Sequence, residues 1–133
     1  LGSNGAEAGI LRADLSGYLR MDGPAVFAQA VEAMVGSCTA SLARAGLSAD
    51  DVSLVVPHQA NARILEAGVD GLGIPRDRLS LVIERYGNTS AASVPLALAD
   101  ALERDRVHDG DVVLFVGFGA GMAWASAVVR WQG

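Results

Sequence analysis

Cysteine, histidine and lysine are scarce in this chain of 133 residues, which has one cysteine, two histidines and no lysine. Cys38 cannot form a disulfide within the chain, and the sequence has no Cys-x-x-Cys motif or Cys/His cluster. These absences exclude a small secreted domain held together by disulfides and a structural zinc site. They are typical of a protein of the reducing cytoplasm, so we expect a cytoplasmic location and no bound metal.

Positive charge is also in short supply. Ten arginines stand against 15 acidic residues, which gives a net charge of −5. A chain with this balance has no extended basic surface with which to hold nucleic acid or an anionic membrane. We therefore expect neither nucleic acid nor a membrane among its partners.

The first five residues, LGSNG, lack the basic and apolar regions of a signal peptide, and the start reads like a chain cut within a loop. The longest run without a charge, residues 112–129, is 18 residues long. A run of about 18 is the lower limit for a membrane helix. Glycines interrupt this run at positions 117, 119 and 121, and its first half is β-branched and aromatic. Two buried strands joined by a glycine turn fit this pattern better than a membrane helix does.

Apolar sequence is abundant: apolar residues make up 51% of the chain and charged residues 19%. This composition excludes disorder, and the length suits one domain. Apolar spacing predicts helices over residues 24–45, 60–72 and 90–105 and strands over 7–15, 52–56, 79–83, 112–116 and 122–129. Strands that alternate with helices indicate an α/β fold. We expect a mixed five-stranded sheet, covered on both faces, with its last two strands antiparallel.

Unusual residues follow three of these strands, at the sheet edge where reactive groups gather in α/β proteins. The first is His58, which stands between a predicted strand and a predicted helix, where the positive helix end can hold the imidazole neutral. The second is Asn88, in the same kind of position. The third is the glycine-rich stretch at 117–121, whose small residues let backbone amides approach a ligand.

Each of these features also has a purely structural explanation. His58 can be a core histidine, Asn88 can be only a helix N-cap, and the glycines can form only a tight hairpin. Their coincidence on one sheet edge favours chemistry. A neutral imidazole and an amide NH₂ that converge on one point provide two donors to an oxygen that gains negative charge. Decarboxylation of a thioester to an enolate requires such donors, and no metal takes part in that step.

Other suggestive residues fit structural roles better. Cys38 lies within the apolar stripe of the helix predicted at 24–45, so we expect a core thiol and not a nucleophile. His108 lies in a charged turn and is expected to be solvated. The glycosylation pattern at 88–90 follows a buried strand in a chain with cytoplasmic features, so we discard it.

Three blocks together resemble a known enzyme family: VPHQANARI at 56–64, RYGNTSAASVP at 85–95 and GFGAGMAW at 117–124. They are similar to the C-terminal half of β-ketoacyl-acyl-carrier-protein synthase III, the initiating condensing enzyme of type II fatty acid synthesis. The likeness runs from Gly2 to Trp131. It implies a thiolase-like fold, in which two similar α/β halves stack in αβαβα layers, and a homodimer. Residues 1–133 would be the second half, with the first half as a partner.

The resemblance also implies roles for particular residues. His58 and Asn88 match the histidine and asparagine that bind the malonyl thioester carbonyl and stabilise the enolate after carbon dioxide leaves. Ala120 matches the position whose backbone N–H helps form an oxyanion hole, and Phe118 and Gly119 lie beside it at the acyl pocket. The family often has glycine in place of Ala120. Alanine serves there unless the backbone needs a positive φ.

Further matches concern the substrate arm and the carrier. The positions that line the channel for the coenzyme A or phosphopantetheine arm are Met21, Gly23, Phe27, Ala60, Asn61 and Ile64. Arg63 matches a basic residue at the channel mouth that receives the acidic acyl carrier protein. The implied substrates are acyl-coenzyme A and malonyl-acyl-carrier protein, with no separate cofactor.

One departure from the family pattern affects activity. The family's nucleophilic cysteine lies in the N-terminal half, and nothing in this sequence replaces it. We therefore expect the chain by itself to be inactive, because no thiol can accept the acyl group. We also expect the long helix at 24–45 to bury its apolar stripe against the missing half. Two alternatives stay open: half of a related acyltransferase or ketosynthase of secondary metabolism, and a non-catalytic module that binds a carrier protein.

Overall fold

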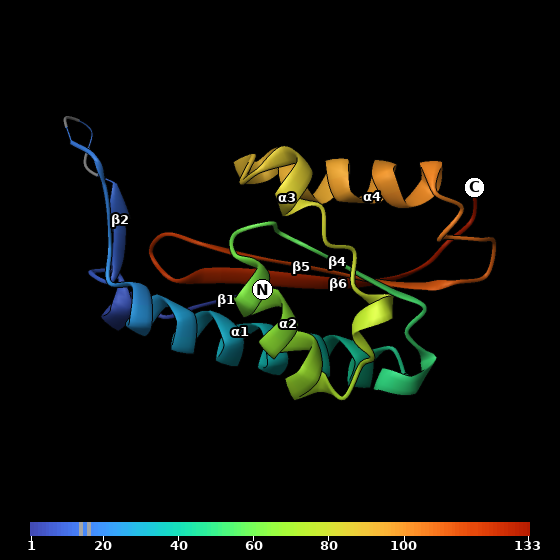
Figure 1. The fold of residues 1–133 in the computed structure, drawn as a ribbon. Coiled ribbons are helices and arrows are strands. Elements are labelled where there is room, and N and C mark those ends of the chain that lie inside the picture. Colours follow the sequence, from blue (N-terminus) through green and yellow to red (C-terminus); the bar gives the residue numbers. More distant parts are fainter. Residues whose placement is uncertain (14, 16) are drawn as a thin grey trace.

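The computed structural model describes residues 1–13, 15 and 17–133. Its centre is a mixed sheet in the strand order β1-β6-β5-β4 (Figure 1). Strand β4 (Leu54–Pro57) runs parallel to β5 (Val112–Gly119), and β5 pairs antiparallel with β6 (Ala123–Arg130). The short strand β1 (Gly2–Ser3) pairs antiparallel with β6 at the edge. The predicted α/β class and the antiparallel final pair are confirmed.

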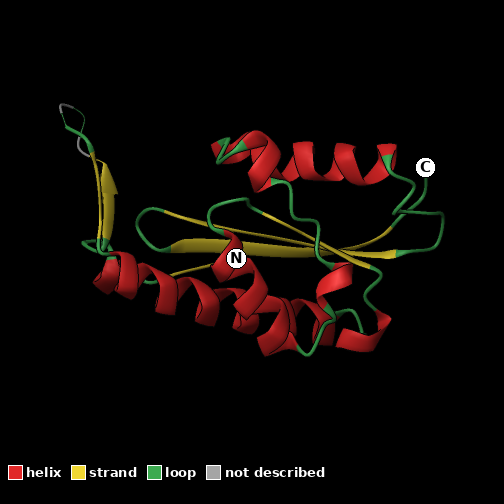
Figure 2. Ribbon diagram, in the orientation of Figure 1, coloured by secondary structure: helices red, strands yellow, loops and turns green. Residues whose placement is uncertain are grey.

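Two helices, α1 (Gly23–Arg44) and α2 (Ala62–Leu72), cover one face of the sheet (Figure 2). Helix α1 begins after Asp22, whose carboxylate accepts a hydrogen bond from the backbone N–H of Ala25 at 3.1 Å. The buried residues of α1 pack against α2, β5 and β6 and are Val26, Ala30, Ala33, Met34, Cys38 and Leu42. The expectation that this stripe packs against a missing half is therefore wrong, because partners within the chain already bury it.

Helix α4 (Ser93–Glu103) covers the opposite face, over β4 and β5. Its alanines pack there against apolar side chains of both strands, in a cluster that includes Ala97, Ala101, Leu54, Val56 and Val113. Every second residue of β6 faces α1: Ser126 forms a hydrogen bond with Ser37 of α1, and Val128 packs in the core on that side. The other residues of the strand alternate with these, point to the opposite face and include four exposed apolar residues: Ala123, Ala125, Ala127 and Val129. This exposed apolar strip of β6 therefore lies on the α4 side of the sheet and not on the α1 side. More exposed large apolar side chains lie elsewhere, among them Leu15, Tyr18, Leu19 and Met21.

Residues 79–83 do not form the fifth strand that the sequence predicts. Leu79 makes a single parallel bridge to Val55, and the short helix α3 (Ile83–Tyr86) begins where the predicted strand would end. Within the described residues, the main sheet therefore has four strands instead of five.

A buried side chain explains this difference. Gln59 is 1% exposed, its Nε2 donates to the carbonyl oxygen of Ser80 at 3.0 Å, and its Oε1 accepts from the backbone N–H of Val82 at 2.9 Å. These are backbone groups that a fifth strand would use in pairing. Strand pairing therefore stops after Leu79, because the side-chain amide of Gln59 takes the place of a neighbouring strand as the hydrogen-bond partner of Ser80 and Val82.

The strand predicted at 7–15 is shorter than expected and lies outside the main sheet. Strand β2 (Leu11–Ala13) pairs with β3 (Leu19–Met21) in a separate ribbon that projects from one end of the molecule (Figure 1). Asp14 lies outside the described residues. Short 3₁₀ turns occupy Gly5–Glu7, Ala49–Asp51, Arg76–Arg78 and Ser90–Ala92, the last of them at the start of the helix predicted at 90–105.

The uncharged run at 112–129 forms the β5–β6 hairpin, as predicted. Within the described part of the chain, α1 is the helix whose length and apolar composition would suffice to cross a membrane. Its apolar side chains are accounted for by the core that it forms with α2 and the sheet.

Candidate active site

His58 stands directly after β4, and it lines one cavity together with Leu11 and Leu19 of the β2–β3 ribbon. Its backbone N–H donates to the carbonyl oxygen of Val116 on β5 at 2.8 Å. Its ring meets the ring of Phe118 edge to face, with centroids 5.8 Å apart. Gly117 of β5 lies beside His58, since a Cβ there would be in ordinary contact with the Cβ of His58, at 3.8 Å. Strand β5 therefore places the half-buried imidazole by its backbone and by a side chain.

The environment of His58 favours a neutral ring. Burial lowers its pKa below the ordinary value of 6.5, while a hydrogen bond with the backbone of Ser90 acts in the opposite direction and is weaker. Its Nδ1 lies 2.6 Å from Oγ of Ser93, a buried residue in the first turn of α4. The ring nitrogen that is not engaged with Ser93 is Nε2.

Asn88 lies in the loop between α3 and α4 and is exposed. Its Oδ1 accepts a hydrogen bond from the backbone N–H of Ser90 at 2.9 Å, and Ser90 has a positive φ of 54°. This turn engages the amide oxygen and leaves the NH₂ group available as a donor. Asn88 is not the cap residue of α4, whose N-cap position is Ala92. The interpretation of Asn88 as only a helix cap is therefore wrong.

The glycine-rich stretch at 117–121 forms the end of β5 and the turn into β6. Positive φ angles occur at Gly121 and Met122 in this turn, and Ala120 is not among the residues with positive φ. Alanine at position 120 is therefore compatible with the backbone, as expected if only its amide is used.

One cavity of about 930 Å³ brings the predicted site residues together. All of the predicted residues line it: Met21, Gly23, Phe27, His58, Ala60, Asn61, Arg63, Ile64, Asn88, Phe118, Gly119 and Ala120. Five further residues complete the lining that sequence reasoning missed: Leu11, Leu19, Pro24, Val26 and Ser90. Residues from four separate segments of the chain therefore converge on one space; these segments are 11–27, 58–64, 88–90 and 118–120.

Arg63 is exposed in the first turn of α2 and lies at this cavity. The side chain of Asn61 caps the same helix by accepting a hydrogen bond from the backbone N–H of Arg63 at 3.0 Å. The cap fixes the backbone of Arg63 at the start of α2, beside the cavity. The exposure predicted for this residue is confirmed.

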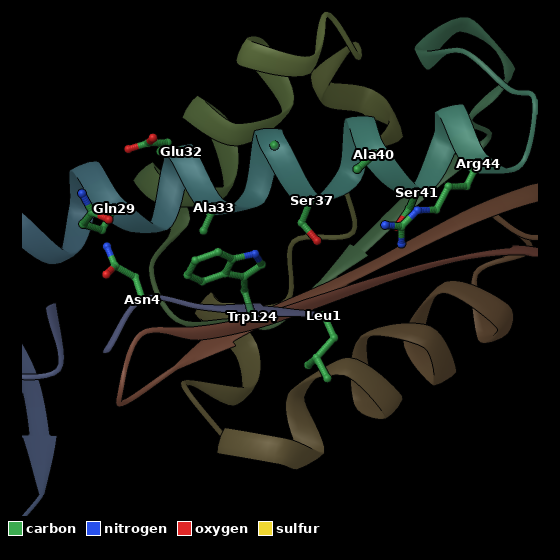
Figure 3. A pocket seen from close by; sticks show the side chains of 11 residues that line it. Leu1, Asn4, Gln29, Glu32, Ala33, Ser37, Ala40, Ser41, Arg44 and Trp124 are labelled. Atoms are coloured by element: carbon green, nitrogen blue, oxygen red, sulfur yellow. The ribbon is translucent and has the colours of Figure 1, made fainter. Parts of the chain in front are cut away.

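A second, smaller cavity of about 370 Å³ lies between α1 and the β1–β6 edge (Figure 3). Trp124 and Ala33 lie at its centre, with Glu32 and Arg44 among the residues on its rim. It borders on the first residue of the chain and contains neither histidine. We therefore assign the candidate site to the larger cavity.

The remaining candidates behave as structural residues. Cys38 is fully buried in the core, and burial raises the pKa of its thiol to about 12, so it is no nucleophile. His108 is exposed, and its ring lies within 3.2 Å of Asp105 and 3.6 Å of Asp111. Both predictions are confirmed.

The arrangement of the layers is that of a thiolase-like fold. The crystal structure of beta-ketoacyl-[acyl carrier protein] synthase III from Thermus thermophilus superposes with a TM-score of 0.93 at 41% identity, over 99% of this chain and 44% of that one. A priming beta-ketosynthase from the R1128 polyketide biosynthetic pathway superposes with a TM-score of 0.88 at 37% identity, over 96% of this chain and 42% of that one.

Sequence comparison gives the family. Residues 42–131 match the family described as 3-oxoacyl-[acyl-carrier-protein] synthase III C terminal, and the chain belongs to that family. The beta-ketoacyl-[acyl-carrier-protein] synthase III of Roseiflexus castenholzii is 51% identical over 115 residues, which is 86% of this chain. The chain spans about a third of the length of that relative, 35%.

Proposed function

We propose that the chain is the C-terminal half of a condensing enzyme that starts fatty acid synthesis. The reaction is a decarboxylative Claisen condensation between a primer acyl group, delivered by acyl-coenzyme A, and malonyl-acyl-carrier protein. The observation that carries this proposal is the shared cavity, where His58, Asn88 and the turn after β5 meet. Because Oδ1 of Asn88 is engaged with Ser90, its NH₂ group is the part free to meet a substrate.

Both side chains act on the thioester carbonyl oxygen of the malonyl group. When carbon dioxide leaves, the electron pair of the broken C–C bond moves onto that thioester and forms an enolate. The NH₂ of Asn88 donates to the developing oxyanion, and Nε2 of His58 donates whenever it carries a proton. The backbone N–H of Ala120 serves a separate oxyanion, formed when the enolate carbon attacks the primer thioester.

The rest of the cavity suits a long and mostly apolar substrate arm. Phe27, Ile64 and Met21 offer apolar walls to a pantetheine chain, and Gly23, Ala60 and Asn61 complete the channel. The exposed Arg63 attracts the acidic carrier protein in a chain whose net charge is otherwise −5.

The covalent step belongs to another part of the enzyme. Within the described residues Cys38 is the one cysteine and it is buried, so the acyl-accepting thiol comes from an N-terminal half. The exposed alanines of β6 and the outer side of α4 form the surface against which that half packs. The complete enzyme is a cytoplasmic homodimer, and its reaction uses no metal or cofactor beyond its thioester substrates.

Joining the chain to the N-terminal half of the Thermus thermophilus relative tests the proposal. We expect the chimera to make a β-ketoacyl-carrier protein from acetyl-coenzyme A and malonyl-carrier protein. Binding of the carrier protein without any turnover would support a non-catalytic module instead.

A related enzyme of secondary metabolism is the second candidate, because the priming beta-ketosynthase of a polyketide pathway is 37% identical. The same chimera, supplied with acyl-coenzyme A primers and hydroxyl or amine acceptors, separates a condensing enzyme from an acyltransferase. Transfer of the acyl group to such an acceptor without carbon dioxide release would favour a related acyltransferase, whereas a ketosynthase of either pathway would release carbon dioxide.

A further inference from the structure

The hydroxyl of Ser93 contacts three polar groups beside the candidate site. Ser93 is 1% exposed, so water does not compete for its hydrogen bonds. Its Oγ lies 2.8 Å from the carbonyl oxygen of Ser90, 3.2 Å from the backbone nitrogen of Gln59 and 2.6 Å from Nδ1 of His58. The Ser90 carbonyl can only accept a hydrogen bond and the Gln59 N–H can only donate one, and together they determine whether Nδ1 of His58 donates or accepts.

A serine hydroxyl has one hydrogen to donate and two lone pairs that accept. The carbonyl oxygen of Ser90 can only accept, so it receives the hydroxyl hydrogen. The N–H of Gln59 can only donate, so it takes one lone pair. The remaining lone pair faces Nδ1 of His58, and this nitrogen must therefore donate.

We propose that Ser93 is a positioning residue that holds neutral His58 in the tautomer with its proton on Nδ1. In this tautomer Nε2 carries a lone pair, so it accepts hydrogen bonds. It donates only after the imidazole has taken up a second proton.

The groups packed around the ring do not oppose this assignment. Phe118 contributes hydrocarbon, and the loop at 88–93 contributes the hydroxyl of Ser93 and the backbone of Ser90, which also forms a hydrogen bond with the ring. Among the described residues that line the cavity, Arg63 is the one with an ionised side chain, and a cation disfavours protonation of the ring. No described carboxylate at the cavity stabilises the imidazolium form.

The consequence for catalysis rests on the proposed function. Asn88 donates to the enolate oxygen at every pH, because its amide does not titrate in this range. His58 donates only as the imidazolium ion. We therefore expect malonyl decarboxylation to fall as the pH rises through the pKa of His58 and to reach a plateau that Asn88 sustains.

The ring nitrogens of His58 report the tautomer directly in a long-range ¹H–¹⁵N correlation spectrum. The chain has two histidines, so histidine labelling gives two ring systems, and exposed His108 is the internal reference. At pH 8 we expect a protonated Nδ1 and a bare Nε2 for His58. A His58 ring protonated on Nε2 would overturn the proposal. If the chain associates, magic-angle-spinning spectra of the sedimented chain give the same information.

Two variants separate the hydroxyl from the rest of the loop. Ser93→Ala removes the acceptor, and we expect an Nε2-protonated population to appear and the pH profile of decarboxylation in the chimera to flatten. Ser93→Thr keeps the hydroxyl and is expected to restore the Nδ1-protonated ring. A tautomer that is unchanged in Ser93→Ala would overturn the role of Ser93. Should Ser93→Ala fail to fold, the wild-type spectrum still decides.

These spectra need no substrate, so they are independent of the proposed function. A chimera that never decarboxylates malonyl-carrier protein, with the Nδ1-protonated ring in place, would reject the proposed function and leave the tautomer assignment standing. The opposite result, decarboxylation with an Nε2-protonated ring at high pH, would reject this inference alone.

Discussion

The ring of Phe118 packs edge to face against the imidazole of His58, with an angle of 71° between the ring planes. Phe118 belongs to β5 and stands opposite Trp124 of β6 in the strand register. A residue far along the chain thus sets the orientation of the candidate catalytic histidine. Rigid support of this kind is what an oriented hydrogen bond to a reacting oxygen requires.

Replacing Phe118 should therefore damage the chemistry more than the fold. In the chimera, we expect Phe118→Ala to lower kcat for malonyl decarboxylation by about 10- to 100-fold, because small misplacements of a catalytic group have effects of that size. Phe115→Ala is the matched control, since Phe115 lies on the same strand and packs in the core on the α4 side. It should lower the melting temperature and spare kcat. Equal losses of kcat in both variants would contradict a positioning role for Phe118.

We expect replacement of Gln59 to lower the stability of the fold more than the activity. The Gln59 amide also donates to the carbonyl oxygen of Pro57 at 3.0 Å, so Gln59→Leu would leave three backbone groups unpaired in the interior. Unpaired buried groups cost about 1–3 kcal/mol each, so we expect a loss of about 3 kcal/mol or more in the free energy of unfolding. Urea denaturation measures it. Gln132→Leu, at an exposed position, is the control and should change little.

The contact between α1 and α2 depends on a glycine. A Cβ at Gly68 would collide with the side chain of Met34, whereas a Cβ at Gly36 would meet nothing within 4 Å. Gly68→Ala should therefore destabilise the chain by about 1–3 kcal/mol through overpacking. Gly36→Ala should stabilise it by about 0.5–1 kcal/mol, since alanine suits a helix interior better than glycine. Thermal unfolding of the two variants compares them, and a loss of similar size in both would contradict the packing argument.

Arg63 should act on the carrier protein and not on the reaction. We expect Arg63→Glu to raise KM for malonyl-carrier protein by about tenfold or more in low salt, to lose this effect in high salt, and to leave KM for malonyl-coenzyme A nearly unchanged. Arg44→Glu is the control, because this exposed arginine lies at the other cavity. A matched rise in KM for both substrates would mean that Arg63 supports the site itself.

The sequence allowed the site to be predicted because its residues follow strand ends. His58 comes directly after β4 and Phe118 lies at the end of β5, and parallel strands bring their carboxyl ends to one edge. The buried helix stripe that contains Cys38 was equally predictable from its spacing. What could not be predicted was the partner of that stripe, because apolar spacing marks a face and does not say which element covers it.

Ser93 and Gln59 were missed for a related reason. A serine at a helix start and a glutamine in a loop give no periodic signal, and their importance comes only from burial and from the groups they meet. The same Gln59 amide made the strand prediction at 79–83 fail, because Leu79 and Val82 are buried there although only Leu79 forms a bridge to a strand. Tertiary hydrogen bonds of this kind are invisible to sequence patterns.

Release of labelled carbon dioxide from malonyl-carrier protein is the most direct test of the account. It is measured with the chimera carrying wild-type, His58→Ala or Asn88→Ala sequence, and with His108→Ala as the control for loss of a histidine outside the cavity. At a pH below the pKa of His58, where its imidazolium form donates, the account predicts that each of the two site variants loses about 100-fold in decarboxylation rate, because an oxyanion donor is worth about that much. Acylation of the nucleophilic cysteine should stay nearly unchanged. Decarboxylation at the wild-type rate in Asn88→Ala and His58→Ala would contradict the assignment of these two residues to the enolate.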